Sequence, residues 1–324
     1  MCTAAVYRTK GLYFGRNLDY ERGFGERIAI TPRLFPFSMR HMSASDGRYA
    51  LIGMAHIAQD FPLYYDAMNE AGLCMAGLNF VGNAVYRAPL PDKHNVAQFE
   101  LIPWLLRQCA TVAEARPLLA QLNITGDPFC EGMPTAQLHW MIADAHDCIV
   151  LESDANGVHI YDDPAGVLTN NPPFPMQLFA LNNYQSLSAA PPQNRFGGEL
   201  PLAEYSRGMG AIGLPGDLSS QSRFVRAAFV RANSVSGSGE TESVTQFFHI
   251  LGSVAQQRGC CRLADGACEY TIYSSCCSAA TKTYYYITYN NPQISAVCLR
   301  PEDASGTSLI SFPMETETQI RQIH

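Results

Sequence analysis

The 324-residue sequence has no apolar run that approaches the length of roughly 18 residues needed to cross a membrane. Basic residues are fewer than acidic ones, 22 against 29, which leaves a formal net charge of −7. This balance disfavours a nucleic-acid-binding surface, so we expect neither a nucleic-acid partner nor a membrane partner. The first residues also lack a basic segment followed by an apolar one, so we expect no secretory signal.

The cysteines lack the spacing of a structural zinc site, in which paired ligands are separated by two to four residues. There are 11 cysteines, an odd number, and the densest group is Cys260, Cys261, Cys268, Cys276 and Cys277. A zinc or redox centre in this group is the less favoured interpretation, and buried thiols on strands are favoured. Without a secretory signal, we expect reduced thiols in a cytoplasmic protein, with no metal ion and no cofactor.

The composition is typical of a globular protein, with 47% hydrophobic and 16% charged residues. No repeat, low-complexity segment or long charged tail interrupts the chain. The best candidate linker, residues 188–194, is too short to separate domains. We therefore expect one domain over residues 1–324, with Met1 removed.

Local patterns predict a mixture of strands and helices. Asn156-Gly157 is typical of a tight hairpin turn, and Thr111 followed by Glu114 is typical of a helix start. Because helices fall between groups of strands, we expect an antiparallel α+β protein whose sheets are covered by helices. Strands are predicted at residues 2–7, 12–18, 49–54, 73–79, 148–152, 158–161, 270–275, 282–289 and 295–299, and helices at 99–109, 111–122, 220–232 and 242–254.

Cys2 is the most informative residue for chemistry. Removal of Met1, which is usual before a small side chain, would leave Cys2 with both a thiol and a free α-amine. The amine can take the thiol proton, so one residue would hold a nucleophile and its base. The Met-Cys dipeptide alone favours a simpler interpretation, in which Cys2 packs in an edge strand.

The predicted return strand brings two charged residues near Cys2. Arg16 would lie beside the thiol, where a guanidinium stabilises a thiolate. Asp19 would hydrogen-bond the α-amine and orient it. Taken by themselves, Arg16 and Asp19 are more often a surface ion pair.

Three further polar segments stand in apolar surroundings. The side-chain amides of Asn79 and of Asn170 or Asn171 are suitable donors to an oxyanion, although Asn before proline is also typical of a turn. Arg223 lies in the first turn of a predicted helix, where the helix dipole does not favour a cation. It either brings a second positive charge to the site or pairs with an acid.

The ordered motifs resemble the choloylglycine hydrolase family, which contains the bile salt hydrolases and the penicillin V acylases. The resemblance covers essentially the whole chain and rests on Cys2-Thr3 and on residues 14–20, 76–80, 166–172, 206–217 and 222–224. It implies an N-terminal-nucleophile hydrolase, a four-layer αββα sandwich with antiparallel sheets. It also favours Asn170 over Asn171 and implies catalytic roles for Cys2, Arg16, Asp19, Asn79, Asn170 and Arg223.

The N-terminal segments and residues 206–217 and 270–277 resemble most the bile salt hydrolases of Gram-positive gut bacteria. This implies hydrolysis of glycine- or taurine-conjugated bile salts through a Cys2 thioester, with Asn79, helped by Asn170, holding the oxyanion. A rigid steroid needs an apolar trough beside the nucleophile, and we expect its walls in loops at residues 20–24, 57–65 and 129–138. The candidate substrate-binding residues are Tyr20, Phe24, Ile57, Phe61, Leu63, Phe129, Met133 and Leu138.

Two other functions stay open at this point. The same catalytic residues would serve a penicillin V acylase or a related acyl-amide hydrolase. A non-catalytic binder of amphipathic acids is a third possibility, although retention of the six candidate catalytic residues argues against it. The resemblance also implies a homotetramer.

Overall fold

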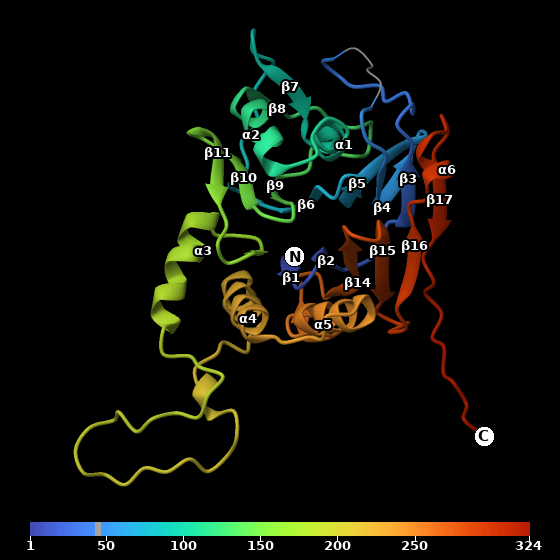
Figure 1. The fold of residues 1–324 in the computed structure, drawn as a ribbon. Coiled ribbons are helices and arrows are strands. Elements are labelled where there is room, and N and C mark those ends of the chain that lie inside the picture. Colours follow the sequence, from blue (N-terminus) through green and yellow to red (C-terminus); the bar gives the residue numbers. More distant parts are fainter. Residues whose placement is uncertain (43–46) are drawn as a thin grey trace.

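Two antiparallel sheets form the centre of the molecule in the computed structural model, which describes residues 1–42 and 47–324 (Figure 1). Within those residues, one sheet has seven strands, in the order β12-β1-β2-β14-β15-β16, with β13 paired to β14. Its strands are β1 Cys2–Arg8, β2 Leu12–Tyr20, β12 Val167–Leu168, β13 Cys261–Arg262, β14 Cys268–Ser278, β15 Thr283–Thr288 and β16 Ser295–Cys298.

The other sheet has eight strands in the same described residues, in the order β11-β10-β9-β6-β5-β4-β3-β17. Its strands are β3 Arg27–Thr31, β4 Leu51–Ala58, β5 Phe61–Asn69, β6 Cys74–Asn79, β9 Leu138–Ala143, β10 Cys148–Asp154, β11 Gly157–Asp162 and β17 Ile310–Pro313. A small parallel pair joins β7 His94–Ala97 to β8 Leu122–Thr125.

Helices cover the outer face of each sheet, which gives the four layers of an αββα sandwich (Figure 1). Helices α4 Ser220–Asn233 and α5 Glu240–Gly252 pack on the seven-stranded sheet, while α1 Leu101–Leu106 and α2 Val112–Ala120 pack on the other. This confirms the expected α+β architecture. The remaining helical segments are η1 Gln98–Glu100, α3 Phe174–Ala180, η2 Leu181–Tyr184, η3 Met209–Ala211 and α6 Pro301–Ala304.

Apolar spacing in the sequence explains how these layers pack. In α5, Val244, Phe247, Phe248 and Leu251 recur at helical spacing and are all buried against the sheet. Strand β1 is buried on both faces from Cys2 to Tyr7, because it lies between a helical layer and the second sheet. Burial on both faces makes the hairpin of β1 and β2 the rigid centre on which the site is built.

Every expected strand and helix is present, although the bounds shift in places, and strands β3, β5 and β9 were not predicted. The helix expected to reach residue 122 ends at Ala120, because Leu122 begins strand β8. Residues 57–65 were expected to form a loop, but they belong to the β4–β5 hairpin, which turns at Gln59 and Asp60 with φ of 49° and 59°. Neither residue is the glycine that usually indicates such a turn, so the pattern did not reveal it.

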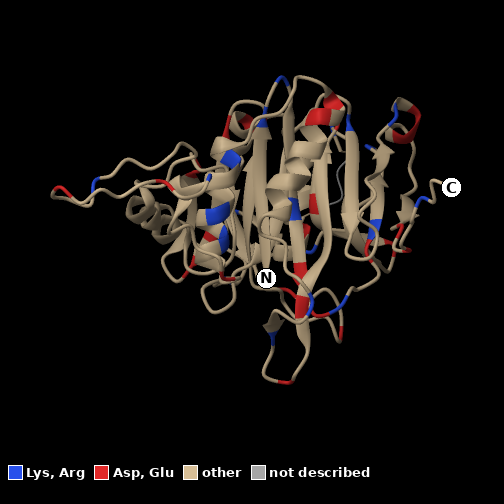
Figure 2. Ribbon diagram, turned by 90° about the horizontal axis from the view of Figure 1, so that it is seen from below, with Lys and Arg blue, Asp and Glu red and all other residues tan. Residues whose placement is uncertain are grey.

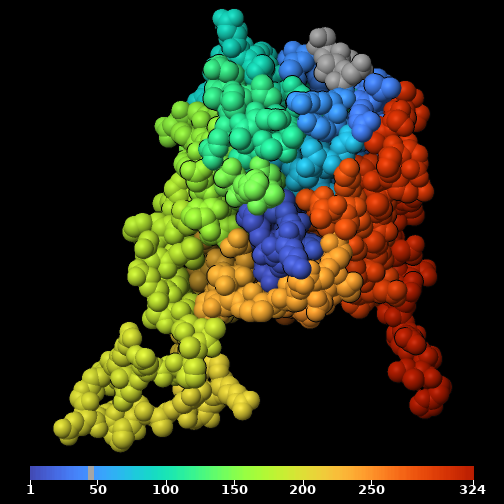
Figure 3. All heavy atoms as spheres, in the orientation of Figure 1, coloured from blue at the N-terminus to red at the C-terminus, as the bar shows by residue number. Residues whose placement is uncertain are grey.

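A long loop leaves the body of the molecule between η2 and α4 (Figures 1 and 3). We call residues 188–210 the arm, since the Ser188 N–H donates to the Gly210 carbonyl at 2.9 Å and closes its base. Basic and acidic residues are interspersed over the surface (Figure 2). Within the described residues, no helix is long and apolar enough to span a membrane.

Candidate active site

The register of the β1–β2 hairpin brings Cys2 and Arg16 together. Cys2 lies opposite Leu18 and Ala4 lies opposite Arg16. Opposed residues in an antiparallel pair share a face, as do residues two apart, so both side chains face the second sheet. Nη2 of Arg16 donates a hydrogen bond to Sγ of Cys2 at 2.6 Å. Cys2 is 2% exposed and Arg16 is 1% exposed, so this contact is shielded from bulk water.

Arg16 reaches across the gap between the two sheets. Its Nη1 donates to the carbonyl oxygens of Tyr65 on β5 and Gly77 on β6. Burial by itself would lower the pKa of Arg16, but the nearby acidic groups of Cys2, Tyr273 and Asp66 outweigh it and raise that pKa. The guanidinium therefore stays charged beside the thiol.

Met1 extends β1 by one residue and is tied to the neighbouring strands. The Asp19 N–H donates to the Met1 carbonyl at 2.9 Å. The Met1 ammonium donates to the Asp19 carbonyl at 2.7 Å and to Oε1 of Glu269 at 2.5 Å. While Met1 is present, the nitrogen of Cys2 is a peptide N–H without basicity. The built-in base exists only after Met1 is removed.

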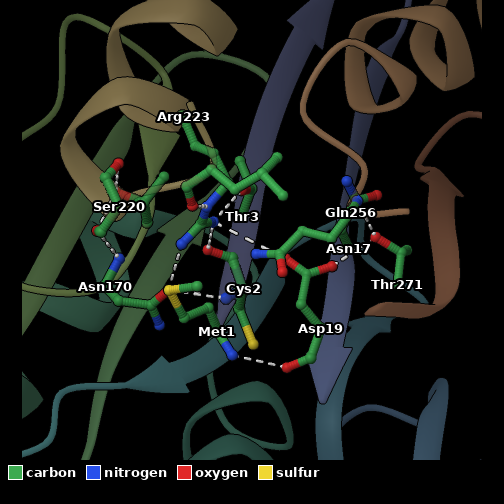
Figure 4. Close-up of polar contacts among 12 residues, drawn as sticks. Met1, Cys2, Thr3, Asn17, Asp19, Asn170, Ser220, Arg223, Gln256 and Thr271 are labelled. Carbon is green, nitrogen blue, oxygen red and sulfur yellow. Dashed lines mark hydrogen bonds and ion pairs between the residues drawn. The ribbon is translucent and has the colours of Figure 1, made fainter. Parts of the chain in front are cut away.

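Asn170 holds the nitrogen of Cys2 (Figure 4). Its Oδ1 accepts from the Cys2 N–H at 2.7 Å and from Nη2 of Arg223 at 2.8 Å. Its Nδ2 donates to the carbonyl of Asn79 at 2.9 Å. Since that amide group is already engaged, Asn170 is placed to orient the nitrogen of Cys2, and the expected help to an oxyanion does not match this geometry.

The neighbouring Asn171 points elsewhere. Its Nδ2 donates to the Val81 carbonyl at 2.8 Å, and its Oδ1 accepts from Asn83 at 2.9 Å. The preference for Asn170 over Asn171 therefore agrees with the geometry.

Arg223, near the start of α4, contacts the backbone of Cys2. Its Nη1 donates to the Cys2 carbonyl and to Oγ1 of Thr3, the latter at 2.6 Å, and lies 3.8 Å from Oδ2 of Asp19. Burial lowers the pKa of Arg223, and the charge of Asp19 opposes that change. Arg223 thus meets both expectations, because it brings a second positive charge to the site and approaches an acid.

Asp19 is fully buried on the face of β2 opposite to that of Arg16. Its Oδ1 accepts from Oγ1 of Thr271 at 2.6 Å, and its Oδ2 accepts from Nε2 of Gln256 at 3.4 Å. Burial raises the pKa of Asp19, while Arg223 and Thr271 oppose the rise. The Met1 ammonium contacts the carbonyl of Asp19. The nitrogen of Cys2, which Asp19 was expected to orient once it is an amine, is held in this structure by Asn170.

A cavity of about 500 Å³ opens beside Cys2 and Arg16 and is walled mainly by apolar and aromatic side chains. Asn79 also lines it, and in the described chain the Asn79 side-chain amide has no hydrogen-bond partner. That amide is therefore free to donate to a bound molecule. Six of the predicted substrate-binding residues line this cavity: Tyr20, Phe24, Leu63, Phe129, Met133 and Leu138.

Two of the predicted wall residues, Ile57 and Phe61, do not line the cavity. The Phe61 ring packs 5.8 Å from that of Phe99 and 5.6 Å from that of Phe129, and both of those rings do line it. Phe61 therefore supports the wall from behind. Ile57 lies on β4 and packs in the outer core cluster under α1 and α2.

Several residues that line the cavity were not predicted from the sequence. They come from β4, β9, η1, α1 and the segment after β2, which pattern alone does not bring together. Arg22 lies two residues after Tyr20, within the predicted wall at residues 20–24, and its charge is a usable signal, since a cation suits an acidic substrate. The missed residues include Arg22, His56, Gln98, Phe99, Ile102 and Trp140.

The C-terminal cysteines do not form a metal centre in the described residues. Cys276 and Cys277 are buried on β14, whereas Cys260 is exposed. Across residues 1–42 and 47–324, no group of three or more His, Cys, Asp or Glu side chains is placed to hold a metal ion.

An αββα sandwich whose second residue is a cysteine, held through its own nitrogen and beside a buried arginine, defines an N-terminal-nucleophile amide hydrolase. A family profile described as linear amide C–N hydrolases, choloylglycine hydrolase family, matches residues 2–312. The chain belongs to this family.

Relatives support the assignment along the whole chain. A protein named bile salt hydrolase/transferase from Lactiplantibacillus plantarum is 53% identical over 319 residues, covering 98% of each chain. One of the same name from Bifidobacterium longum subsp. longum is 36% identical, covering 96% of this chain and 99% of its own. The crystal structure of a conjugated bile acid hydrolase from Clostridium perfringens superposes with a TM-score of 0.92 at 33% identity and full coverage of both chains.

A penicillin V acylase from Agrobacterium tumefaciens shares the fold. It has a TM-score of 0.76 at 21% identity and covers 98% of this chain and 94% of its own.

Proposed function

We propose that this protein hydrolyses the amide bond of bile acids conjugated to glycine or taurine. The observation that carries the proposal is the 2.6 Å contact of Arg16 with Sγ of Cys2 at the wall of an apolar cavity of about 500 Å³. A cavity of this size and lining suits a rigid apolar ring system. The bile salt and bile acid hydrolases among the relatives support the same substrate class.

The reaction begins with the thiol of Cys2 after Met1 is removed. The α-amine takes the thiol proton, and the sulfur attacks the amide carbon of the substrate. The carbonyl oxygen becomes an oxyanion, to which the free side-chain amide of Asn79 donates. The amine then gives its proton to the leaving nitrogen, which departs as glycine or taurine.

The acyl group is now held on Cys2 as a thioester. Water attacks the thioester with the α-amine as general base, and the bile acid leaves as the thiol reforms. In this scheme Asn170 orients the amine, and Arg223 fixes the Cys2 backbone through its carbonyl. Asp19 balances the charge of Arg223 from 3.8 Å.

The acidic end of the substrate needs a cation that is free to bind it. Arg16 and Arg223 make the site electropositive, which suits an anionic group, but both are buried and hydrogen-bonded to the protein. Arg22 is exposed at the cavity, where its guanidinium lies 5.3 Å from the ring centre of Phe24. We therefore assign the attraction of the carboxylate or sulfonate to Arg22.

The test is release of amine from glycocholate, taurocholate and phenoxymethylpenicillin, measured side by side with Cys2→Ser as the control. We expect release from both bile salts and none from the variant. Release from the penicillin alone would preserve the mechanism and replace the substrate with that of a penicillin V acylase. No release from any of them, with Met1 absent and Cys2 reduced, would contradict the proposal and favour a non-catalytic binder of amphipathic acids.

We further propose that the protein is a homotetramer in which the arm contacts a neighbouring copy. The arm exposes large apolar side chains, with Phe196 at 80% and Tyr205 at 84%. Such a patch is costly to leave in water and is typical of an association surface. Light scattering should give the mass of a tetramer for the native chain and a smaller mass for Phe196→Ser with Tyr205→Ser. Native protein that runs as a monomer would overturn the proposal.

The cysteines support a location in the cytoplasm. All 11 are free thiols, and six of them are buried. A reducing compartment preserves such thiols. Cell fractionation should recover the activity with cytoplasmic markers, and recovery from the medium would contradict this.

A further inference from the structure

Arg16 is a buried cation whose direct partners leave its charge without a carboxylate. Its Nη1 binds two neutral carbonyl groups and its Nη2 binds Sγ of Cys2. A buried charge is costly unless a counter-charge and a full set of hydrogen bonds surround it. The question is therefore which group holds Arg16 in place before and during the reaction.

Asp66, the residue after Tyr65 on β5, is fully buried behind Arg16. Its Oδ1 accepts from Oη of Tyr273 at 2.7 Å. Its Oδ2 accepts from Oγ of Ser275 at 2.9 Å and from Oη of Tyr284 at 2.7 Å. Three hydroxyl donors around one carboxylate are the arrangement expected for its charged form.

The cluster joins the two sheets next to Arg16. Asp66 belongs to the eight-stranded sheet, whereas its three donors lie on β14 and β15 of the other (Figure 1). Ser275 is the link to Arg16, because its Oγ also accepts from the Arg16 backbone N–H at 3.1 Å. Tyr65, next to Asp66, supplies one of the carbonyls that bind Arg16.

The charged groups around Asp66 are consistent with a link between Asp66 and Arg16. Burial raises the pKa of Asp66, and Arg16 with the three hydroxyl groups opposes the rise. The titratable groups that face Asp66 are Arg16 on β2, Tyr273 and Cys277 on β14, and Tyr284 on β15. Arg16 is the one cation in that set.

We propose that Asp66 is a positioning residue for the reaction: with Tyr273, Ser275 and Tyr284 it holds Arg16 at the distance from which the guanidinium contacts Cys2 Sγ. The inference rests on the proposed role of Cys2. It assigns Asp66 no contact with substrate, and its effect passes through Arg16.

The test uses alkylation of Cys2 by iodoacetamide in Met1-free protein, followed on the Cys2 peptide by mass spectrometry. This readout needs no substrate, so it is separate from the assignment to bile salts. We expect Asp66→Asn to lower the alkylation rate at pH 7 by about tenfold, since a displaced Arg16 no longer stabilises the thiolate. On a hydrolysed substrate, kcat should fall by a similar factor and KM should change less than about twofold.

A purely electrostatic role gives the opposite sign. Removal of a negative charge behind Arg16 would then favour the thiolate and speed alkylation. A faster or unchanged rate in folded Asp66→Asn would therefore overturn the proposal. So would a loss of stability without a change in the rate.

Two milder variants keep the test decisive if Asp66→Asn does not fold. Tyr273→Phe and Tyr284→Phe each remove one hydroxyl donor and leave the carboxylate, and each should slow alkylation a few-fold. The matched control is Tyr13→Phe on β2, another buried tyrosine that donates to a carboxylate, Oε2 of Glu240, at 3.0 Å. It should alkylate at the wild-type rate. Wild-type rates in all three tyrosine variants would contradict the proposal.

Discussion

Oδ1 of Asn170 lies 2.7 Å from the backbone nitrogen of Cys2, across 168 residues of sequence. The same oxygen accepts from Arg223, whose guanidinium also binds the carbonyl of Cys2. Both backbone polar groups of the nucleophilic residue are therefore held by side chains from other elements. The α-amine formed on loss of Met1 inherits this orientation, so the geometry of the base is set before substrate enters.

Asn170→Ala should lower kcat by about 10²-fold, because small errors in the placement of a reacting group cost about that much. The matched control is Asn171→Ala, since Asn171 bonds to Val81 and Asn83 and not to Cys2. Amine release under saturating substrate measures both. Equal losses in the two variants would show that the turn, and not the contact with Cys2, is what matters.

Cys2→Ser should reduce hydrolysis by at least about 10³-fold with little change in melting temperature, because a hydroxyl is a far weaker nucleophile than a thiolate at neutral pH. Cys298→Ser is the control, since Cys298 is an exposed thiol on β16 of the same sheet. It should retain wild-type activity. Substantial activity in Cys2→Ser would mean that another residue attacks the amide.

Phe129→Ala should raise KM for conjugated bile salts by about tenfold and leave kcat nearly unchanged. Phe129 lines the cavity beside Phe99, so its loss removes apolar contact made equally in the ground state and the transition state. Phe179→Ala is the control, because Phe179 on α3 is 74% exposed. Initial rates over a range of glycocholate concentrations give both constants. A fall in kcat at constant KM would argue against a binding role.

Asp163 should make stability depend on pH. Burial raises its pKa from 3.8 to about 7, although the Gly166 N–H donates to it at 2.8 Å. The folded protein then keeps this proton up to about pH 7, whereas the unfolded chain loses it near 3.8. The stabilisation that the buried Asp163 contributes to folding is complete at low pH and is lost as pH rises towards 7. The loss amounts to a few kcal/mol, because each unit of pKa difference corresponds to about 1.4 kcal/mol.

The measurement is the free energy of unfolding in urea for wild type and Asp163→Asn between pH 4.5 and 8. We expect the wild type to lose stability relative to the variant as pH rises. Asp162→Asn serves as the control, since the side chain of Asp162 is 80% exposed and it should show a constant difference. A constant difference for Asp163→Asn as well would refute the assignment.

The local sequence pattern was sufficient to predict the part of the site that contains Cys2 and Arg16. Strands β1 and β2 are joined by a short turn, so their register, and with it the placement of Arg16 beside Cys2, follows from a hairpin that can be predicted. Strands β3, β5 and β9 were not predicted, because strands covered on both faces lack the alternation that reveals a strand.

The roles of residues far from Cys2 in the sequence were harder to predict. Asn170 was expected to help an oxyanion, and its contacts place it at the Cys2 nitrogen. Residues 57–65 do not form the loop expected as a cavity wall. Two of the predicted substrate-binding residues, Ile57 and Phe61, therefore do not line the cavity. A side chain's type indicates what it can donate or accept, but its partners depend on how separate elements pack.

The sequence by itself determined the nucleophile, the hairpin that presents it, the class of fold and the family, because these depend on local pairing and on ordered motifs along the chain. Only the tertiary structure decided which side chains line the cavity and that Asp66 lies beneath Arg16. Those contacts join β2, β5, β14 and β15 across up to 259 residues. They form only when two sheets close on each other, and no spacing within one element encodes them.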